Sequence, residues 1–160
     1  MNAVVRSSQL EFRPMQLQDI DRVMEIELVS YPHPWTAAIF KDCLKAGYQG
    51  IMATSDPLDI GYAMLSVAVG EAHLLNLCIH PAFQGRGYGR QLLEHVFEQA
   101  GQGGAKTLFL EVRESNRIAQ LLYLDLGFNQ IGSRPGYYPS HKGREDALVF
   151  ARHLFETQPE

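Results

Sequence analysis

A glycine-rich stretch, Gln84-Gly85-Arg86-Gly87-Tyr88-Gly89-Arg90, has the residue types of a phosphate-binding loop. It follows an apolar run at residues 74–79 and precedes residues with the apolar spacing of a helix. Such a turn directs several backbone N–H groups to one point, where the helix dipole and flanking arginines add positive charge. A phosphate group would be stabilised there, although the same residues also fit a glycine-rich turn that binds nothing.

Two common phosphate-binding motifs do not fit this stretch. A dinucleotide fingerprint, G-x-G-x-x-G, would need a glycine where Arg90 stands. A P-loop, G-x-x-x-x-G-K-[ST], has its candidate at Lys106-Thr107, where alanines occupy both glycine positions. The pattern that remains is Gln84-x-x-Gly87-x-Gly89.

Two further residues have side chains suited to proton transfer. Glu111 stands in the apolar stretch 108–112, where a carboxylate is unusual unless it is paired or functional. Strand alternation places Arg113 on the same face, so an ion pair between them is the alternative. Tyr123 lies on the next amphipathic segment, where a core tyrosine is the commoner outcome.

The elements that must position these residues follow from the apolar spacing. We expect helices at residues 20–28, 36–45, from the glycine loop to about 101–104, and from a Ser115 cap to Gly127; strands are expected at 10–15, 48–54, 60–69, 72–80, 106–112, 128–133 and 147–154. This order predicts an α/β fold with a mixed, mostly antiparallel sheet, a parallel strand pair around the central helix, and helices on both faces. Strand 106–112 is expected to be buried on both faces, and residues 134–146 to form a loop.

Composition bounds the class of protein. The chain has 160 residues, of which 46% are hydrophobic and 20% charged, so we expect one domain over 1–160, with a core at about 10–155 and flexible tails at 1–9 and 156–160. No apolar run reaches a membrane span and no signal peptide is evident, so a cytoplasmic protein is expected. The six histidines are scattered, so no metal is predicted, and Cys43 and Cys78 suit reduced structural positions. The net charge of −4 argues against nonspecific nucleic-acid binding and is compatible with a basic peptide partner.

Several short motifs occur in a specific order, and the likeness to a known family that they carry runs from about residue 10 to residue 154. They are Pro34-Trp35, Leu75-Asn76-Leu77, the glycine loop, Leu110-Glu111-Val112-Arg113, Ser115-Asn116, Leu122-Tyr123, Leu126-Gly127-Phe128, Tyr137-Tyr138-Pro139 and Gly143-Arg144-Glu145-Asp146-Ala147. In this order and spacing the chain resembles the GCN5-related N-acetyltransferases (GNAT family). It resembles most closely the bacterial ribosomal-protein-alanine N-acetyltransferases, and more distantly archaeal and eukaryotic N-terminal acetyltransferases.

The resemblance implies a GNAT acyltransferase fold and transfer of an acetyl group from acetyl-CoA to the N-terminal amine of a small-subunit ribosomal protein. By the same resemblance Glu111 is the proton acceptor and Tyr123 the proton donor. Backbone N–H groups of a strand edge that splays from its neighbour would stabilise the reacting carbonyl. The implied cofactor contacts are Leu77, Cys78, Ile79, Gly85, Arg86, Gly87, Tyr88, Gly89, Arg90 and Asn116. A monomer without nucleic-acid or membrane partners is expected.

The acceptor side is less defined by the sequence. Trp35, Tyr137 and Tyr138 could line a peptide groove, or belong to rigid loops packed on the core. Three carboxylates could attract a basic peptide or be solvated surface charges: Glu27, Glu145 and Asp146. The chain departs from the resembled enzymes at Arg134-Pro135-Gly136 and at Leu148-Val149-Phe150-Ala151. Rival functions are therefore a GNAT enzyme acting on a lysine or a small amine, and a non-catalytic coenzyme-A-binding module.

Overall fold

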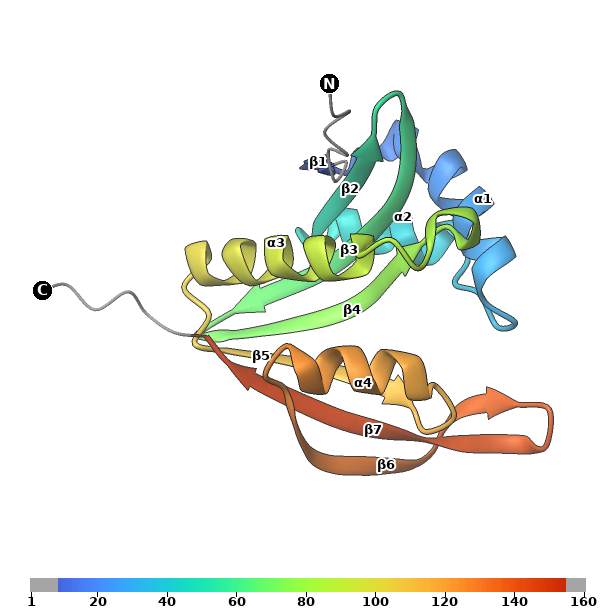
Figure 1. The fold of residues 1–160 in the computed structure, drawn as a ribbon, viewed down its shortest axis with the longest axis vertical. Helices are drawn as coiled ribbons and strands as arrows, with labels where there is room; N and C mark the ends of the chain where they lie inside the picture. The colour runs from blue at the N-terminus through green and yellow to red at the C-terminus, as the bar shows by residue number, and fades with distance from the viewer. Residues whose placement is uncertain (1–8, 155–160) are drawn as a thin grey trace, which may run out of the picture. The chain divides into compact units, whose positions relative to one another are not determined.

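The computed structural model describes residues 9–154, and the predicted tails fall outside this range except for Gln9. The described chain confirms the predicted order of elements (Figure 1). The elements are β1 (Glu11–Pro14), η1 (Leu17–Asp19), α1 (Ile20–Ser30), α2 (Ala37–Lys45), β2 (Gln49–Ser55), β3 (Leu58–Ala68), β4 (Glu71–Ile79), η2 (Pro81–Phe83), α3 (Tyr88–Gln102), β5 (Thr107–Arg113), α4 (Arg117–Asp125), β6 (Asn129–Ser140) and β7 (Gly143–His153).

The strands are hydrogen-bonded in the order β1-β2-β3-β4-β5-β7-β6. β1 pairs with β2, and β7 pairs with both β5 and β6, in antiparallel fashion. β4 and β5 pair in parallel, Glu71–Leu74 with Thr107–Leu110, on either side of the predicted crossover helix α3. The mixed, mostly antiparallel sheet predicted from the sequence is therefore confirmed.

The chain divides into two compact units. Among the described residues, the first unit contains 9–64 together with Asn76–His95, and the second contains Leu65–Leu75 together with 96–154. β3, β4 and α3 each contribute residues to both units. The candidate functional residues are also divided between the two units.

The core of the first unit forms around one face of α1. Ile20, Val23 and Ile26 recur at helical spacing and are buried, which explains why this segment folds as an amphipathic helix. They pack in one cluster with Phe40 of α2 and with five further buried residues of the strands and the β1–η1 connection: Met15, Met52, Tyr62, Met64 and Cys78. Thr36 caps α2, because its hydroxyl accepts a hydrogen bond from Ile39 N–H at 3.3 Å.

In the second unit, β5 is not buried on both faces as predicted. Leu108, Leu110 and Val112 are buried, whereas the alternating residues, including Glu111 and Arg113, are half-buried. Figure 1 shows α4 lying along β5 and β7. The cap of α4 is Asn116 rather than the predicted Ser115, because the Asn116 side chain accepts from Ala119 N–H at 3.2 Å.

The predicted loop at residues 134–146 is also wrong, since most of it is a long β6–β7 hairpin. Tyr138 pairs with Glu145 and Ser140 with Gly143, so the strands continue almost to the turn. Between Arg134 and Tyr138 the register shifts, and Gly136 adopts a positive φ of 59° there. Proline and glycine therefore mark a bulge inside a strand rather than a loop.

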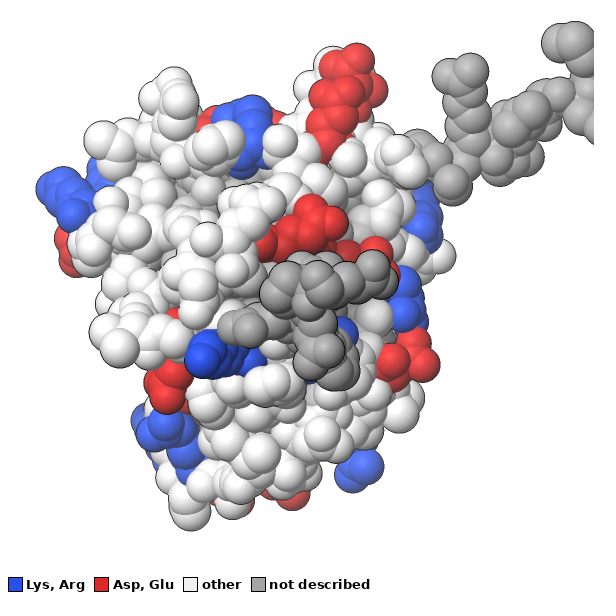
Figure 2. All heavy atoms as spheres, turned by 90° about the vertical axis from the view of Figure 1, so that its left-hand side faces the viewer, with Lys and Arg blue, Asp and Glu red and all other residues white. Residues whose placement is uncertain are grey.

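Charged side chains are mixed on the face drawn in Figure 2. Basic and acidic residues lie scattered among uncharged ones rather than gathered in one field of a single sign. Within residues 9–154, no helix is long and apolar enough to cross a membrane. The same residues contain no group of three or more His, Cys, Asp or Glu placed to hold a metal ion. Cys43 and Cys78 are free thiols.

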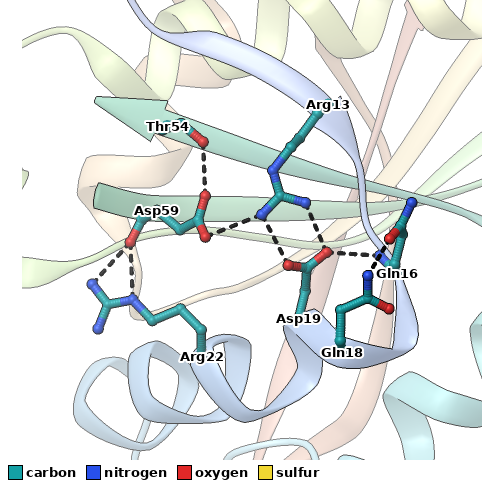
Figure 3. Close-up of polar contacts among 7 residues, drawn as sticks. All are labelled: Arg13, Gln16, Gln18, Asp19, Arg22, Thr54 and Asp59. Atoms are coloured by element: carbon teal, nitrogen blue, oxygen red, sulfur yellow. Dashed lines mark hydrogen bonds and ion pairs between the residues drawn. The ribbon is translucent and has the colours of Figure 1, made fainter. Parts of the chain in front are cut away.

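A polar network ties β1 to its surroundings in the first unit (Figure 3). Arg13 donates to both carboxylate oxygens of Asp19, at 2.8 and 2.9 Å, and to Asp59 at 3.1 Å. Asp19 also accepts from Gln16 N–H at 2.8 Å, so it does not cap α1 by its side chain. Arg22 of α1 donates to the Asp59 carbonyl at 2.8 and 3.0 Å. The network joins β1, η1, α1 and the β2–β3 hairpin.

Candidate active site

The glycine loop connects β4 to α3 as predicted. Gly85 and Gly87 have φ values of 79° and 81°, a region that side chains with a Cβ rarely adopt. No heavy atom lies within 4 Å of a Cβ placed on either residue, so backbone conformation rather than crowding requires glycine. The Gly87 carbonyl accepts from Gln91 N–H at 3.1 Å, which begins α3. The first N–H groups of a helix lack intrahelical partners, so this turn suits an anion.

The side chains around the loop either anchor it or add positive charge beside it. Gln84, the first residue of the motif, donates to the Ile79 carbonyl at 2.9 Å and so fastens the loop to the end of β4. Arg86 and Arg90 are exposed, and the Arg86 guanidinium lies 5.3 Å from the centre of the Phe83 ring. These two cations flank the loop as the sequence suggested.

The backbone direction at the end of β4 can be worked out from its neighbours in the first unit. His80 N–H donates to the Ile60 carbonyl of β3, and the Cys78 carbonyl lies 2.6 Å from a Cβ placed on Gly61. Direction alternates along a strand, so the N–H groups of Leu77 and Ile79 point away from β3. The backbone N–H and C=O groups of Cys78 point toward β3, and its side chain is buried. Of the three predicted cofactor contacts, Leu77 and Ile79 therefore have the backbone orientation that a ligand beside this strand needs.

Glu27 is not a surface charge, contrary to both sequence interpretations, because its side chain is only 1% exposed. Its carboxylate accepts from the Tyr62 hydroxyl, from the Asn76 amide at 3.0 Å and from Trp35 N–H at 2.9 Å. These donors come from β3, β4 and the residue before the α2 cap. The hydroxyl of Tyr31 donates to the Leu77 carbonyl at 2.7 Å. The segment between α1 and α2 is thus held against the end of β4.

Trp35 fits the interpretation of a rigid segment packed on the core. It is half-buried, and its ring centre lies 5.1 Å from that of Phe40. Sequence analysis missed the role of Glu27 in placing it. The available signal was the helical spacing of Val23, Ile26 and Glu27, which puts Glu27 next to the apolar face of α1.

In the second unit, Glu111 of β5 is contacted by one side chain from β4 and one from β6. Nε2 of His73, on β4, lies 2.9 and 3.2 Å from the two carboxylate oxygens. Nε of Arg134, on β6, lies 3.4 Å from Oε1. These contacts, chiefly the His73 hydrogen bond, hold the pKa of Glu111 below its usual value despite partial burial. Sequence analysis missed His73 because it lies 38 residues from Glu111.

The alternative ion pair between Glu111 and Arg113 is not formed. Arg113 instead donates to Glu145 at 2.8 Å and to the Pro139 carbonyl at 2.7 Å. Its guanidinium also lies 4.5 Å from the centre of the Tyr138 ring. Glu145 additionally accepts from Ser115 N–H at 3.0 Å, so it is a structural partner rather than a solvated charge.

Tyr123 of α4 is half-buried, with its ring 5.5 Å from Phe128 and 6.2 Å from Phe150 between centres. Burial raises the pKa of its phenol to about 12. The phenol therefore stays protonated at neutral pH, as a proton donor must. The aromatic packing also fits the alternative of a core tyrosine.

The remaining predicted residues of the second unit lie on α4 and β6. Asn116 is exposed, and its cap uses the side-chain oxygen, which leaves the amide group able to donate. Tyr137 is 47% exposed, and its ring packs edge-on against Tyr138 with centres 4.9 Å apart. Asp146 accepts from Gly136 N–H at 2.8 Å and so stabilises the bulge beside these tyrosines.

Comparisons with known proteins agree with this arrangement. Residues 17–128 match the Acetyltransferase (GNAT) family. This chain belongs to the GNAT acetyltransferase family. The matched GNAT region contains the end of β4, the glycine loop, Glu111 and Tyr123.

Individual GNAT relatives are similar over most of their length. The chain is 41% identical to the ribosomal protein bS18-alanine N-acetyltransferase of Haemophilus ducreyi, over 86% of this chain and 95% of the relative. It is 36% identical to the enzyme of that name from Escherichia coli K12, over 86% and 93%. The crystal structure of the ribosomal-protein-S18-alanine N-acetyltransferase from Escherichia coli superposes with a TM-score of 0.87 and 32% identity, over 95% of this chain and 98% of that one.

Proposed function

We propose that this GNAT enzyme transfers the acetyl group of acetyl-CoA to the N-terminal alanine of ribosomal protein bS18. The curated relatives described above carry this activity in their names and match more than four-fifths of the chain. The structural observation that carries the proposal is the glycine turn between β4 and α3. There, two left-handed glycines, a helix start and two exposed arginines form a site for the phosphates of coenzyme A.

The residues at the end of β4 also fit the pantetheine part of acetyl-CoA. The N–H groups of Leu77 and Ile79 point away from β3, so an extended amide chain can hydrogen-bond there as an added strand does. When bound, acetyl-CoA supplies the acetyl group as an activated thioester. In this proposal Leu77 N–H donates to the carbonyl oxygen as negative charge develops on it.

Glu111 and Tyr123 divide the proton transfers between them. The α-amine of a peptide has a pKa of about 8, against ~10.4 for lysine, so far more of it is neutral at pH 7. Glu111 accepts the proton that the amine nitrogen loses as the new N–C bond forms. Tyr123 donates a proton to the sulfur as the C–S bond breaks. Its phenol is protonated at neutral pH, and the departing thiolate can take up a proton because thiols have a pKa of about 8.5.

The experiment that tests this function compares three peptides with acetyl-CoA as donor. The first carries the free N-terminus of bS18, the second has that N-terminus blocked, and the third presents only a lysine amine. We expect transfer to the first peptide alone, detected as a mass increase and as release of free thiol. Transfer to the lysine peptide, or to none of the three while acetyl-CoA still binds, would contradict the proposed acceptor.

A further inference from the structure

His73 makes a contact with Glu111 that the proposed mechanism has not yet used. A single ring nitrogen, Nε2, lies within hydrogen-bond distance of both carboxylate oxygens, at 2.9 and 3.2 Å. The two side chains differ in access to water. That of Glu111 is 12% exposed and that of His73 is 35% exposed. His73 is therefore the member of the pair that has more access to the solvent.

Glu111 alone is a weak choice of base. Its carboxylate lies within hydrogen-bond distance of His73 Nε2 and beside the Arg134 guanidinium, and these contacts lower its pKa. General-base efficiency increases as the pKa of the base approaches the working pH. Imidazole is the side chain that gains and loses its proton between pH 5 and 8.

We propose that His73 is a positioning and proton-relay residue for acetyl transfer, and that Glu111 and His73 act as one base. This proposal rests on the proposed function. As the N–C bond forms and the C–S bond breaks, the amine proton moves to Glu111. In the tautomer of His73 that carries its ring proton on Nδ1, the protonated Glu111 carboxyl then passes this proton to the lone pair of Nε2. The resulting imidazolium faces an ionised carboxylate at 2.9 Å, which stabilises it, and it then releases a proton to water.

The other charged and titratable groups near the pair do not replace it. From β6, Arg134 contacts Glu111 but stays protonated, since a guanidinium does not act as a base near neutral pH. Tyr138 of β6 has its pKa raised, first by burial and then by the Glu111 charge, so it stays neutral. On β5, Arg113 is paired with Glu145. On β4, Glu71 shares the alternating face of His73 and is exposed.

The test measures kcat with the bS18 peptide across pH for the wild-type enzyme, His73→Gln and His73→Ala. We expect kcat of both variants at pH 7 to fall about tenfold, because Glu111 then has no imidazole to which it can pass the proton. The acid limb of the kcat profile should move to lower pH, toward the range of a free glutamate. Added imidazole should restore part of the kcat of His73→Ala. His141→Gln, at the exposed β6–β7 turn, is the matched control and should keep the wild-type profile.

Two results would overturn the relay. The first is a His73→Ala variant whose kcat and acid limb of the pH profile equal those of the wild type, which would show that the imidazole ring takes no part in proton transfer. The second is a lower kcat in His73→Ala that imidazole does not restore, with the acid limb of the pH profile unshifted and the melting temperature unchanged. That result would leave His73 with a packing role only. If the wild-type enzyme leaves the peptide unmodified, the proposed function fails instead. The ring ¹⁵N spectrum then tests the pair: the Nε2 signal of His73 should shift in Glu111→Ala, and an unchanged signal would reject it.

Discussion

At the scale of single residues, chemistry depends on what each side chain touches rather than on its type. Glu111 and Glu27 are both glutamates beside apolar residues. Glu27 accepts three uncharged donors in the core, whereas Glu111 faces His73 and Arg134 at a half-buried strand face. Only the second is placed where a proton can reach water through a neighbour.

Replacement of Tyr123 by Phe tests the proton donor. The change removes the hydroxyl while keeping the ring contacts with Phe128 and Phe150. General-acid catalysis contributes about 10²–10⁴-fold, so kcat should fall at least ~100-fold with acetyl-CoA affinity unchanged. Steady-state kinetics and titration with acetyl-CoA measure the two quantities. Tyr48→Phe, at an exposed tyrosine, is the control. Near-normal turnover of Tyr123→Phe would show that Tyr123 is a core-packing residue and not the proton donor.

Val69 offers a stability prediction at the same scale. It is the one residue other than glycine with positive φ among residues 9–154, at 43°, and it is fully exposed. A β-branched side chain is strained there, whereas Asn followed by Gly70 suits this hairpin turn. Val69→Asn should raise the free energy of unfolding by about 1 kcal/mol, measured by urea denaturation. Ala68→Asn, next to the turn, should not stabilise. A lower urea midpoint for Val69→Asn would contradict the argument.

At the scale of elements, one buried carboxylate joins four segments of the first unit. Glu27 of α1 holds β3, β4 and the start of α2, and Tyr31 adds a bond to the Leu77 carbonyl. The end of β4, where the cofactor is proposed to bind, is therefore braced by the segment that contains Trp35. A displacement of one of these elements should therefore shift the backbone of the others.

Glu27→Ala tests this joint. The substitution leaves the Tyr62 hydroxyl, the Asn76 amide and Trp35 N–H without their acceptor in a buried place. The free energy of unfolding should fall by about 2–4 kcal/mol, because unsatisfied buried donors are costly. Glu25→Ala removes a glutamate from the same helix whose side chain is 66% exposed, and it should cost less than about 0.5 kcal/mol. Equal losses in the two variants, measured by urea denaturation, would refute the role of Glu27.

At the scale of the whole molecule, several carboxylates make stability depend on pH. Asp19 is the buried example: its hydrogen bonds with Arg13 hold its pKa below the usual value. A depressed pKa stabilises the fold above the pKa of the unfolded chain, about 3.9 for Asp. That stability is lost as the pH falls through the lower, folded-state value.

Asp19→Asn should therefore lower the unfolding free energy at pH 7 and matter less as the medium becomes acidic. The difference from the wild type should shrink between about pH 5 and pH 3, because the wild type loses the same contribution when Asp19 is protonated. Urea unfolding at pH 7, 5, 4 and 3 measures it. Asp21→Asn, at an exposed position of α1, is the control. A difference that stays constant over this range would show that the Arg13 contacts contribute no pH dependence.

The sequence by itself determined the order of elements and the glycine loop. Both are local: apolar spacing selects helix or strand, and the left-handed conformation at Gly85 and Gly87 is a property of those residues. It also placed Glu111 on the same strand face as Arg113, because alternation is local as well. The same local rules failed at residues 134–146, where pairing with β7 extends a strand through Pro135 and Gly136.

The tertiary structure alone decided which groups meet. His73 and Glu111 lie 38 residues apart and come together because β4 and β5 pair in parallel. No local sequence pattern predicts the register of that pairing. Glu27 is buried because Trp35, Tyr62 and Asn76 converge on it from separate elements. Hydrogen-bond partners and burial depend on contacts distant in sequence, so the pairing of Glu111 with His73 and of Arg113 with Glu145 could be known only from the folded chain.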